Sequence, residues 1–202
     1  MKTTINTCQH GISSATKTIW NILSINIGWL ACIWAAARGY HWLGLIIVPI
    51  LFVIHITWIE KHKTRAVLIV ALMSMIIGFA ADTLLIVMGA VEPNRWIMPP
   101  PLTTLWDVMI WANFSLALNV SLRFLQNKPL AAALLGAAFA PGTYYAGDRL
   151  GALVFSEPVL GGLVCVGAVW FFVMPGLSLM ARYFYLTKGS LPIHLEEPAG
   201  SD

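Results

Sequence analysis

The chain has 202 residues, of which 58% are hydrophobic and 10% are charged, and its formal net charge is +3. A soluble domain carries about 25% charged residues, so this chain has too little polar surface to cover a core that faces water. The composition therefore predicts an integral membrane protein and leaves almost no chain for a separate soluble module. No run of basic residues is dense enough to indicate a nucleic-acid partner.

The apolar residues fall into six runs, each near the roughly 20 residues that a membrane-crossing helix needs. Helices are predicted because lipid cannot satisfy an open backbone and the runs are too long for barrel strands. The predicted fold class is all-α, a bundle of six transmembrane helices within residues 18–182. The runs are residues 18–37, 42–59, 66–90, 102–122, 130–148 and 158–182.

Polar segments flank this predicted bundle at both ends. Residues 1–17 precede the first run without a signal-peptide cleavage site, so we expect a cytoplasmic N-terminal segment. Residues 183–202 are interpreted as a flexible cytoplasmic tail.

The lysines and arginines predict the orientation of the bundle. With six spans, both termini and the loops at 60–65 and 123–129 share one side of the membrane. That side carries nine positive residues: Lys2, Lys17, Lys61, Lys63, Arg65, Arg123, Lys128, Arg182 and Lys188. The other side carries Arg38, Arg95 and Arg149. Because cytoplasmic loops are enriched in positive residues, both termini are predicted to be cytoplasmic.

Asp82 interrupts the apolar stretch GFAADTLLIVMGAV, residues 78–91. A charge inside a span costs several kcal/mol unless it is paired or hydrated, so it indicates a functional site by default. Ser74 and Gly78 precede Asp82 at a spacing of four and let another helix approach, so Asp82 is expected to face protein. The alternative is a structural role, in which Asp82 only bonds Tyr145, Asn113 or Arg149.

Asp107 lies just inside the outer end of the following span. The two spans are antiparallel neighbours, so both carboxyl groups are expected in the outer half of the membrane. We predict Asp82 and Asp107 as catalytic residues, a general base and a general acid. The predicted substrate-binding residues are Tyr145, Arg149, Asn113, Trp111 and Ser115, and Arg149 or Arg95 is expected to bind a phosphate headgroup.

Other polar and small residues in the spans receive structural interpretations. The three cysteines fit no metal or redox spacing, and His55 has no second histidine at ligand spacing, so we expect no metal and no cofactor. Gly136 belongs to a seam of small residues in the fifth span, which predicts a close helix contact. The asparagines of the spans are interpreted as interhelical hydrogen-bonding groups: Asn21, Asn26, Asn113 and Asn119.

Residues 102–125, LTTLWDVMIWANFSLALNVSLRFL, and 135–152, LGAAFAPGTYYAGDRLGA, carry a resemblance. The chain resembles a bacterial family of small inner-membrane proteins catalogued as domain of unknown function 2878. The matching positions are Asp82, Leu105, Trp106, Asn119, Ser121, Leu122, Gly136, Ala137, Pro141, Tyr145, Ala146, Gly147, Leu150, Gly151 and Ala152. The family more often reads Gly-Pro where this chain has Ala140-Pro141.

The resemblance implies a multi-pass protein of the bacterial inner membrane but supplies no activity. Members of the family are associated with neighbouring genes for lipid-modifying enzymes. Three functions therefore stay open from the sequence. The first is a membrane-embedded, lipid-processing enzyme with an outward-facing polar pocket. The second is a transporter of small solutes, or one coupled to protons, in which Asp82 titrates. The third is a non-catalytic assembly subunit that binds other inner-membrane proteins.

Overall fold

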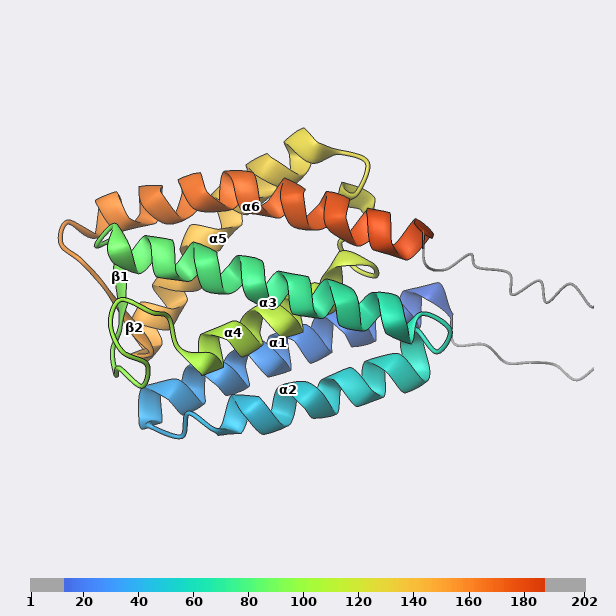
Figure 1. Ribbon diagram of the computed structural model, residues 1–202, viewed down its shortest axis with the longest axis horizontal. Coiled ribbons are helices and arrows are strands. Elements are labelled where there is room, and N and C mark those ends of the chain that lie inside the picture. The colour runs from blue at the N-terminus through green and yellow to red at the C-terminus, as the bar shows by residue number, and fades with distance from the viewer. Residues whose placement is uncertain (1–12, 188–202) are drawn as a thin grey trace, which may run out of the picture.

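The computed structural model describes residues 13–187, which form an all-α protein with six helices (Figure 1). Each predicted span contains one helix. The helices are α1 (Ser14–Arg38), α2 (Leu43–Ile54), α3 (Thr64–Val87), α4 (Leu105–Leu118), α5 (Pro129–Leu150) and α6 (Val159–Thr187). The π-helix η1 (His55–Ile59) extends α2, and the 3-10 helix η2 (Arg123–Leu125) lies between α4 and α5.

Local sequence signals fix several helix ends. The Ser13 side chain accepts a hydrogen bond of 3.1 Å from the Thr16 backbone N–H and so caps the start of α1. Gly39, with φ of 85°, ends α1 in the left-handed conformation that glycine adopts without strain. Pro129 occupies the first turn of α5, where its missing N–H costs nothing.

Several helices differ in length from the predicted spans. α1 begins at Ser14, four residues before the predicted start at 18, so part of the predicted N-terminal segment is helical. α4 has 14 residues and ends at Leu118, four residues before the predicted end at 122. At 1.5 Å per residue it is about 21 Å long, shorter than the roughly 30 Å hydrocarbon layer. α6 continues to Thr187, five residues beyond the predicted end at 182, so part of the predicted tail is helical. Residues 1–12 and 188–202 lie outside the described residues.

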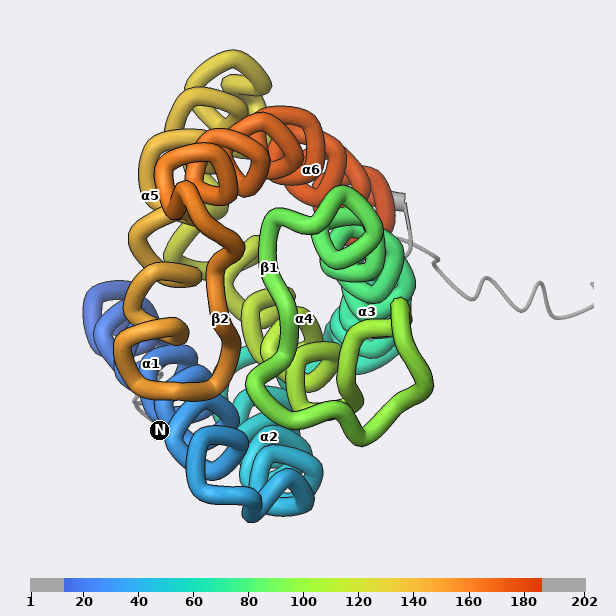
Figure 2. Tube along the Cα trace, turned by 90° about the vertical axis from the view of Figure 1, so that its left-hand side faces the viewer, coloured from blue at the N-terminus to red at the C-terminus, as the bar shows by residue number. Residues whose placement is uncertain are grey.

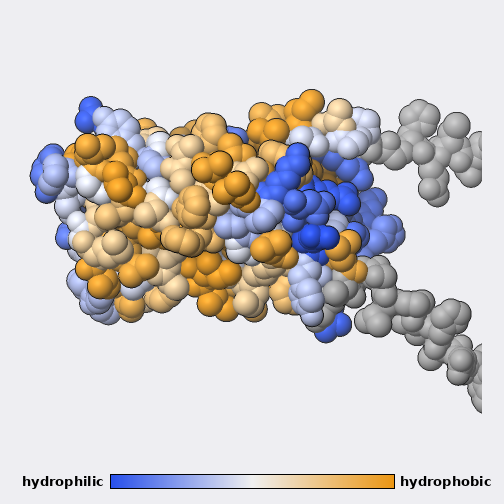
Figure 3. Space-filling view, turned by 90° about the horizontal axis from the view of Figure 1, so that it is seen from above, coloured by the Kyte–Doolittle hydropathy of each residue, from blue (hydrophilic) through white to orange (hydrophobic). Residues whose placement is uncertain are grey.

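Three of the helices are long and apolar enough to cross a membrane by their length and composition: Ser14–Arg38, Thr64–Val87 and Val159–Leu186. Two shorter stretches, Leu43–Ile59 and Leu105–Leu118, are also apolar. Hydrophobic residues cover much of the middle of the surface seen in Figure 3, and the strongest hydrophilic patch lies near the end where α1 begins. Such a distribution is typical of a membrane protein.

α4 lies inside a ring formed by the other five helices (Figure 2). Its buried side chains lie on all of its faces and include Trp106, Val108, Asn113 and Leu116. Most of its residues are apolar, and its few polar side chains are buried with them, so α4 occupies the centre of the bundle. α1 begins and α6 ends at the same end of the bundle (Figure 1).

Two short strands close the opposite end, and the sequence did not predict them. β1 (Val91–Pro93) follows α3, and β2 (Leu153–Phe155) follows α5. The strands are antiparallel, with Glu92 opposite Val154. The strand pair joins the connector after α3 to the connector after α5, about 60 residues later in the sequence. The two strands lie across one end of α4 (Figure 2).

The predicted small-residue contacts are present. A Cβ atom on Gly78 would lie 2.0 Å from the Trp111 ring, and one on Gly136 would lie 2.7 Å from the Trp170 carbonyl oxygen. Gly78 therefore allows α4 to approach α3, and Gly136 allows α6 to approach α5. The Asn21 amide donates a hydrogen bond of 2.9 Å to the Leu116 carbonyl oxygen, as expected for an interhelical bond.

Candidate functional site

The centre of the candidate site is the buried carboxyl group of Asp82 on α3, which is only 2% exposed. It accepts hydrogen bonds from the Trp111 indole N–H on α4 and from the Tyr144 hydroxyl on α5. The Trp170 indole N–H on α6 donates in turn to the Tyr144 hydroxyl at 3.5 Å. Four helices thus meet at one carboxyl group, and three aromatic side chains fix its position.

Asp107 lies beside Asp82, in the first turn of α4. The Thr103 hydroxyl donates a hydrogen bond of 2.7 Å to Oδ2 of Asp107, and Asp107 lines the same small cleft as Asp82. A hydrogen bond between two carboxyl groups requires a proton, because an ionised carboxylate only accepts. Asp82 and Asp107 are called here the carboxyl pair, and a proton on either group would allow a hydrogen bond between the two.

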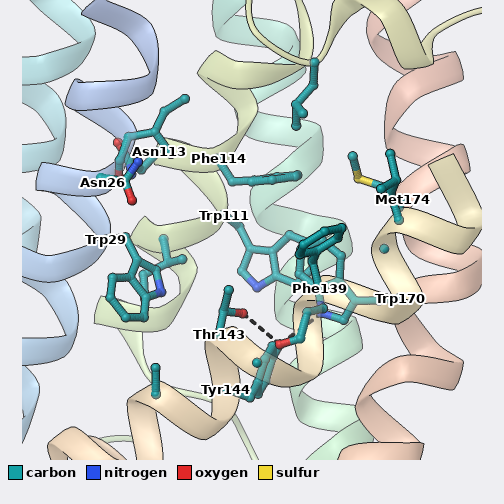
Figure 4. Close-up of a pocket in the computed structure, with 18 of the residues that line it drawn as sticks. Asn26, Trp29, Trp111, Asn113, Phe114, Phe139, Thr143, Tyr144, Trp170 and Met174 are labelled. Carbon is teal, nitrogen blue, oxygen red and sulfur yellow. Dashed lines mark hydrogen bonds between the residues drawn. The ribbon is translucent and has the colours of Figure 1, made fainter. Parts of the chain in front are cut away.

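A cavity of about 750 Å³ lies beside the carboxyl pair, between α1, α4, α5 and α6. Asp107 and Tyr144 line the cavity where it meets the pair. Trp29 lines the α1 side, Trp170 and Met174 line the α6 side, and Trp111 lies between them (Figure 4). Most of the remaining wall is aliphatic or aromatic, so the cavity suits an apolar ligand.

The cavity opens on the apolar surface of the bundle between α1 and α5. Asn26 on α1 and Phe139 on α5 both line it, and both are exposed, with 68% of Phe139 accessible. The two helices approach beside the strands, where a Cβ on Gly147 would lie 3.5 Å from the Ile33 side chain. The opening therefore lies away from the strands and faces the region that lipid would occupy.

Stacked aromatic rings form the inner wall of the cavity. The Trp111 and Trp170 rings are stacked with their centroids 4.7 Å apart, and Phe114 meets the Trp170 ring edge-on at 5.5 Å. Because Trp111 also bonds Asp82, the same rings shape the cavity and hold the carboxyl pair.

A second, smaller cleft of about 20 Å³ lies on the strand side of the carboxyl pair. It is lined by both carboxyl groups, by Tyr144 and Thr104, and by Glu92 of β1. Asp107 and Tyr144 line both the cavity and the cleft. These two side chains therefore form part of the wall between the two spaces.

The structure brings some of the predicted substrate-binding residues to this site and leaves others out. Trp111 and Asn113 line the cavity, and the Asn113 amide donates to the Ile25 carbonyl oxygen at 2.7 Å. Ser115 is buried against its own helix, where its hydroxyl donates to the Ala112 carbonyl oxygen, and it lines neither space.

Tyr145, a predicted substrate-binding residue, lines neither the cavity nor the cleft. It is 45% exposed, whereas its neighbour Tyr144 reaches Asp82. Successive residues of a helix point about 100° apart, so the two side chains leave α5 in different directions. The spacing of four that links Gly136 and Ala140 leads on to Tyr144, and this signal could have identified it.

The two predicted phosphate-binding arginines also lie elsewhere. Arg149 is exposed and lines neither space. Arg95 reaches the end of α1, where its guanidinium would lie 2.6 Å from a Cβ on Gly39. Burial and the charge of Arg95 both lower the pKa of His41 in the adjacent turn. Arg95 therefore belongs to the surface at the α1–α2 connection.

His55 and the acidic residues give no sign of a metal centre. The His55 Nε2 atom lies 3.1 Å from the Glu60 carboxylate, and both side chains are buried. Within residues 13–187, no group of three or more His, Cys, Asp or Glu side chains could hold a metal ion.

A protein-family model described as Protein of unknown function (DUF2878) matches residues 18–176, and the chain therefore belongs to this family. The match covers Asp82, Asp107 and Tyr144, and it agrees with the resemblance seen in the sequence. No curated protein and no solved structure matches the chain.

Proposed function

We propose that this protein is a membrane-embedded enzyme that performs acid–base chemistry on the polar group of a membrane-dissolved amphiphile. The observation that supports this proposal is the position of the carboxyl pair, at the polar end of an apolar cavity that opens on the apolar surface. An amphiphile could enter from the lipid between α1 and α5 and place its polar group against Asp107 and Tyr144.

The size and the wall of the cavity favour such a ligand. A volume of about 750 Å³ lies within the range of roughly 300–1,000 Å³ that is usual for small-molecule sites. The stacked rings of Trp111 and Trp170 offer a rigid apolar face to a hydrocarbon chain. Asn113 adds a polar group on the wall toward α1.

The charges around the site narrow the substrate class. Among the described residues, the side chains that line the cavity and the cleft include no lysine, arginine or histidine. An anionic phosphate group would meet the carboxyl pair with no positive partner, which is unfavourable in a medium of low dielectric constant. We therefore propose that the polar group of the substrate is uncharged or positively charged, in place of the phosphate headgroup expected from the sequence.

The proposed chemistry uses the proton of the carboxyl pair. Asp107 lines the cavity and is the group that would touch the substrate, accepting a proton from it or donating one to it. Asp82 would exchange that proton with Asp107, while Trp111 and Tyr144 hold Asp82 in place. Two carboxyl groups in unequal surroundings can divide the roles of acid and base in this way.

We further propose a multi-pass topology in a bacterial inner membrane, with six crossings and both termini in the cytoplasm. Lys63, Arg65 and Arg182 lie near the bundle end where α1 begins, and Arg38, Arg95 and Arg149 lie toward the other end. The positive-inside rule assigns the first end to the cytoplasm and the carboxyl pair to the outer half. Because α4 is short, the segments 99–104 and 119–128 would complete the fourth crossing.

The experiment that tests this function is the total lipid profile of a strain lacking the gene. If the protein is an enzyme, its substrate amphiphile should accumulate in this strain and its product should disappear. The wild-type gene should then restore the original lipid profile. Asp82→Asn and Asp107→Asn should fail to restore it at normal membrane abundance. An unchanged profile in the deletion strain, under conditions in which the protein is normally expressed, would contradict the enzyme proposal.

A proton-coupled transporter remains the second candidate, because Asp107 and Tyr144 separate two spaces on opposite sides of the carboxyl pair. Purified protein in lipid vesicles distinguishes the two. An enzyme converts its substrate without an ion gradient, whereas a proton-coupled transporter moves its substrate chemically unchanged in response to a pH gradient.

A further inference from the structure

We infer that the small cleft beside the carboxyl pair is a water site that connects the pair to the aqueous surface at the β1–β2 end. The use of this water by the enzyme rests on the proposed function. The existence of the site does not, because it is argued from the walls of the cleft alone.

The cleft has the size and the polar lining that a water molecule needs. Its volume of about 20 Å³ exceeds the roughly 10–15 Å³ required for one water. A buried water forms two to four hydrogen bonds, and the lining side chains of Asp82, Asp107, Tyr144 and Thr104 supply enough donors and acceptors.

Thr104 provides an independent observation that points to a ligand. Its side chain is completely buried, it lines the cleft, and its Oγ1 atom has no hydrogen-bond partner among the described residues. Thr104 is the N-cap residue of α4, where a threonine hydroxyl usually accepts a hydrogen bond from the first turn, but its side chain makes no such bond. A buried hydroxyl without a partner is costly, and a water in the cleft would supply the partner.

Glu92 indicates where water could enter the cleft from the aqueous surface. It lies on β1, its side chain is exposed, and it lines the same cleft as the buried Asp82. The strand pair that the sequence did not predict therefore brings an exposed acidic residue, Glu92, into the wall of the cleft. Substrate and water would then reach the carboxyl pair from opposite sides, the substrate from the lipid and the water from the aqueous face.

The test measures how fast the proton of the carboxyl pair exchanges with solvent. The protein in lipid vesicles is transferred from H2O to D2O, and infrared spectroscopy follows the C=O band of the protonated carboxyl group. The bands are assigned from their loss in Asp82→Asn and Asp107→Asn. Thr104→Val keeps the side-chain shape but removes the hydroxyl, and it should slow the exchange roughly tenfold, the effect of losing one hydrogen bond. Thr104→Ser should restore it.

Matched controls separate the cleft from its surroundings. Thr143→Val removes a hydroxyl from the large cavity, where it bonds its own helix at 2.8 Å, and should leave the exchange rate unchanged. Glu92→Gln should slow the exchange, whereas Glu157→Gln, an exposed carboxylate after β2 that lines neither space, should not.

The outcomes are decisive in both directions. Slower exchange in Thr104→Val, with rescue by Thr104→Ser, supports the water site. Exchange at the wild-type rate in Thr104→Val overturns it, even if Asp82→Asn still abolishes activity, so this failure is separate from failure of the proposed function. If Thr104→Val does not fold, Glu92→Gln decides, and wild-type exchange in that variant overturns the proposed route.

Discussion

Tyr144 on α5 donates a hydrogen bond to Oδ1 of Asp82 on α3, across 62 residues of sequence. This bond links two helices at the carboxyl pair and gives Asp82 a neutral donor in place of a cation. Trp170 donates to the same hydroxyl, so the tyrosine is fixed from a third helix. The site is therefore built on packed helices, which hold functional groups more firmly than loops do.

Removing this hydroxyl should reduce activity while the fold persists. We expect Tyr144→Phe to lower the rate at which the protein converts its lipid substrate by roughly 10- to 100-fold, which is the effect of losing a hydrogen bond to a charged group. The measurement is the amount of product lipid that the variant restores in the deletion strain. Tyr145→Phe changes the exposed neighbour and should behave as wild type. Equal loss in the two variants would show that Tyr144 is not specific to the site.

Close packing of α3 against α4 should depend on Gly78. A Cβ there would lie 2.0 Å from the Trp111 ring, so Gly78→Ala should lower the free energy of unfolding by about 1–3 kcal/mol through overpacking. Gly142→Ala is the matched control, because a Cβ on Gly142 has no contact within 4 Å. Thermal unfolding in detergent measures the stability of both variants. Equal melting temperatures for Gly78→Ala and Gly142→Ala would contradict the close contact between Gly78 and Trp111.

The proposed orientation places the carboxyl pair toward the outside. Reporter fusions after Lys17 and after Lys188 should both give cytoplasmic signals, and a fusion after Trp96 should give a periplasmic signal. Replacing Lys61, Lys63 and Arg65 with glutamine should weaken this pattern, because it removes positive residues from one cytoplasmic loop. A periplasmic signal from either terminal fusion would rule out the topology.

The sequence predicted all six helices because each apolar run is close to a membrane-crossing length. It predicted Asp82 and Asp107 in the same half of the membrane because their helices are joined by a short connector, but it left open whether the two side chains meet. The sequence predicted a later end for α4 because residues 119–122 have the same mixture of apolar and small polar residues as the span before them. It missed β1 and β2 because strands of three residues leave no periodic pattern. Tyr144 was missed because an error of one residue rotates a helical side chain by about 100°.

The most direct test of the central claim is the effect of Asp82→Asn on the conversion of lipid by purified protein. Total lipid from the deletion strain is incubated with wild-type or variant protein in vesicles, and the products are measured by mass spectrometry. Asparagine preserves the shape of the side chain but cannot accept or release the shared proton at this site. We predict that Asp82→Asn folds normally and loses at least about 100-fold of the conversion rate, within the usual range for acid–base groups. Conversion at the wild-type rate by a folded Asp82→Asn variant would contradict the account.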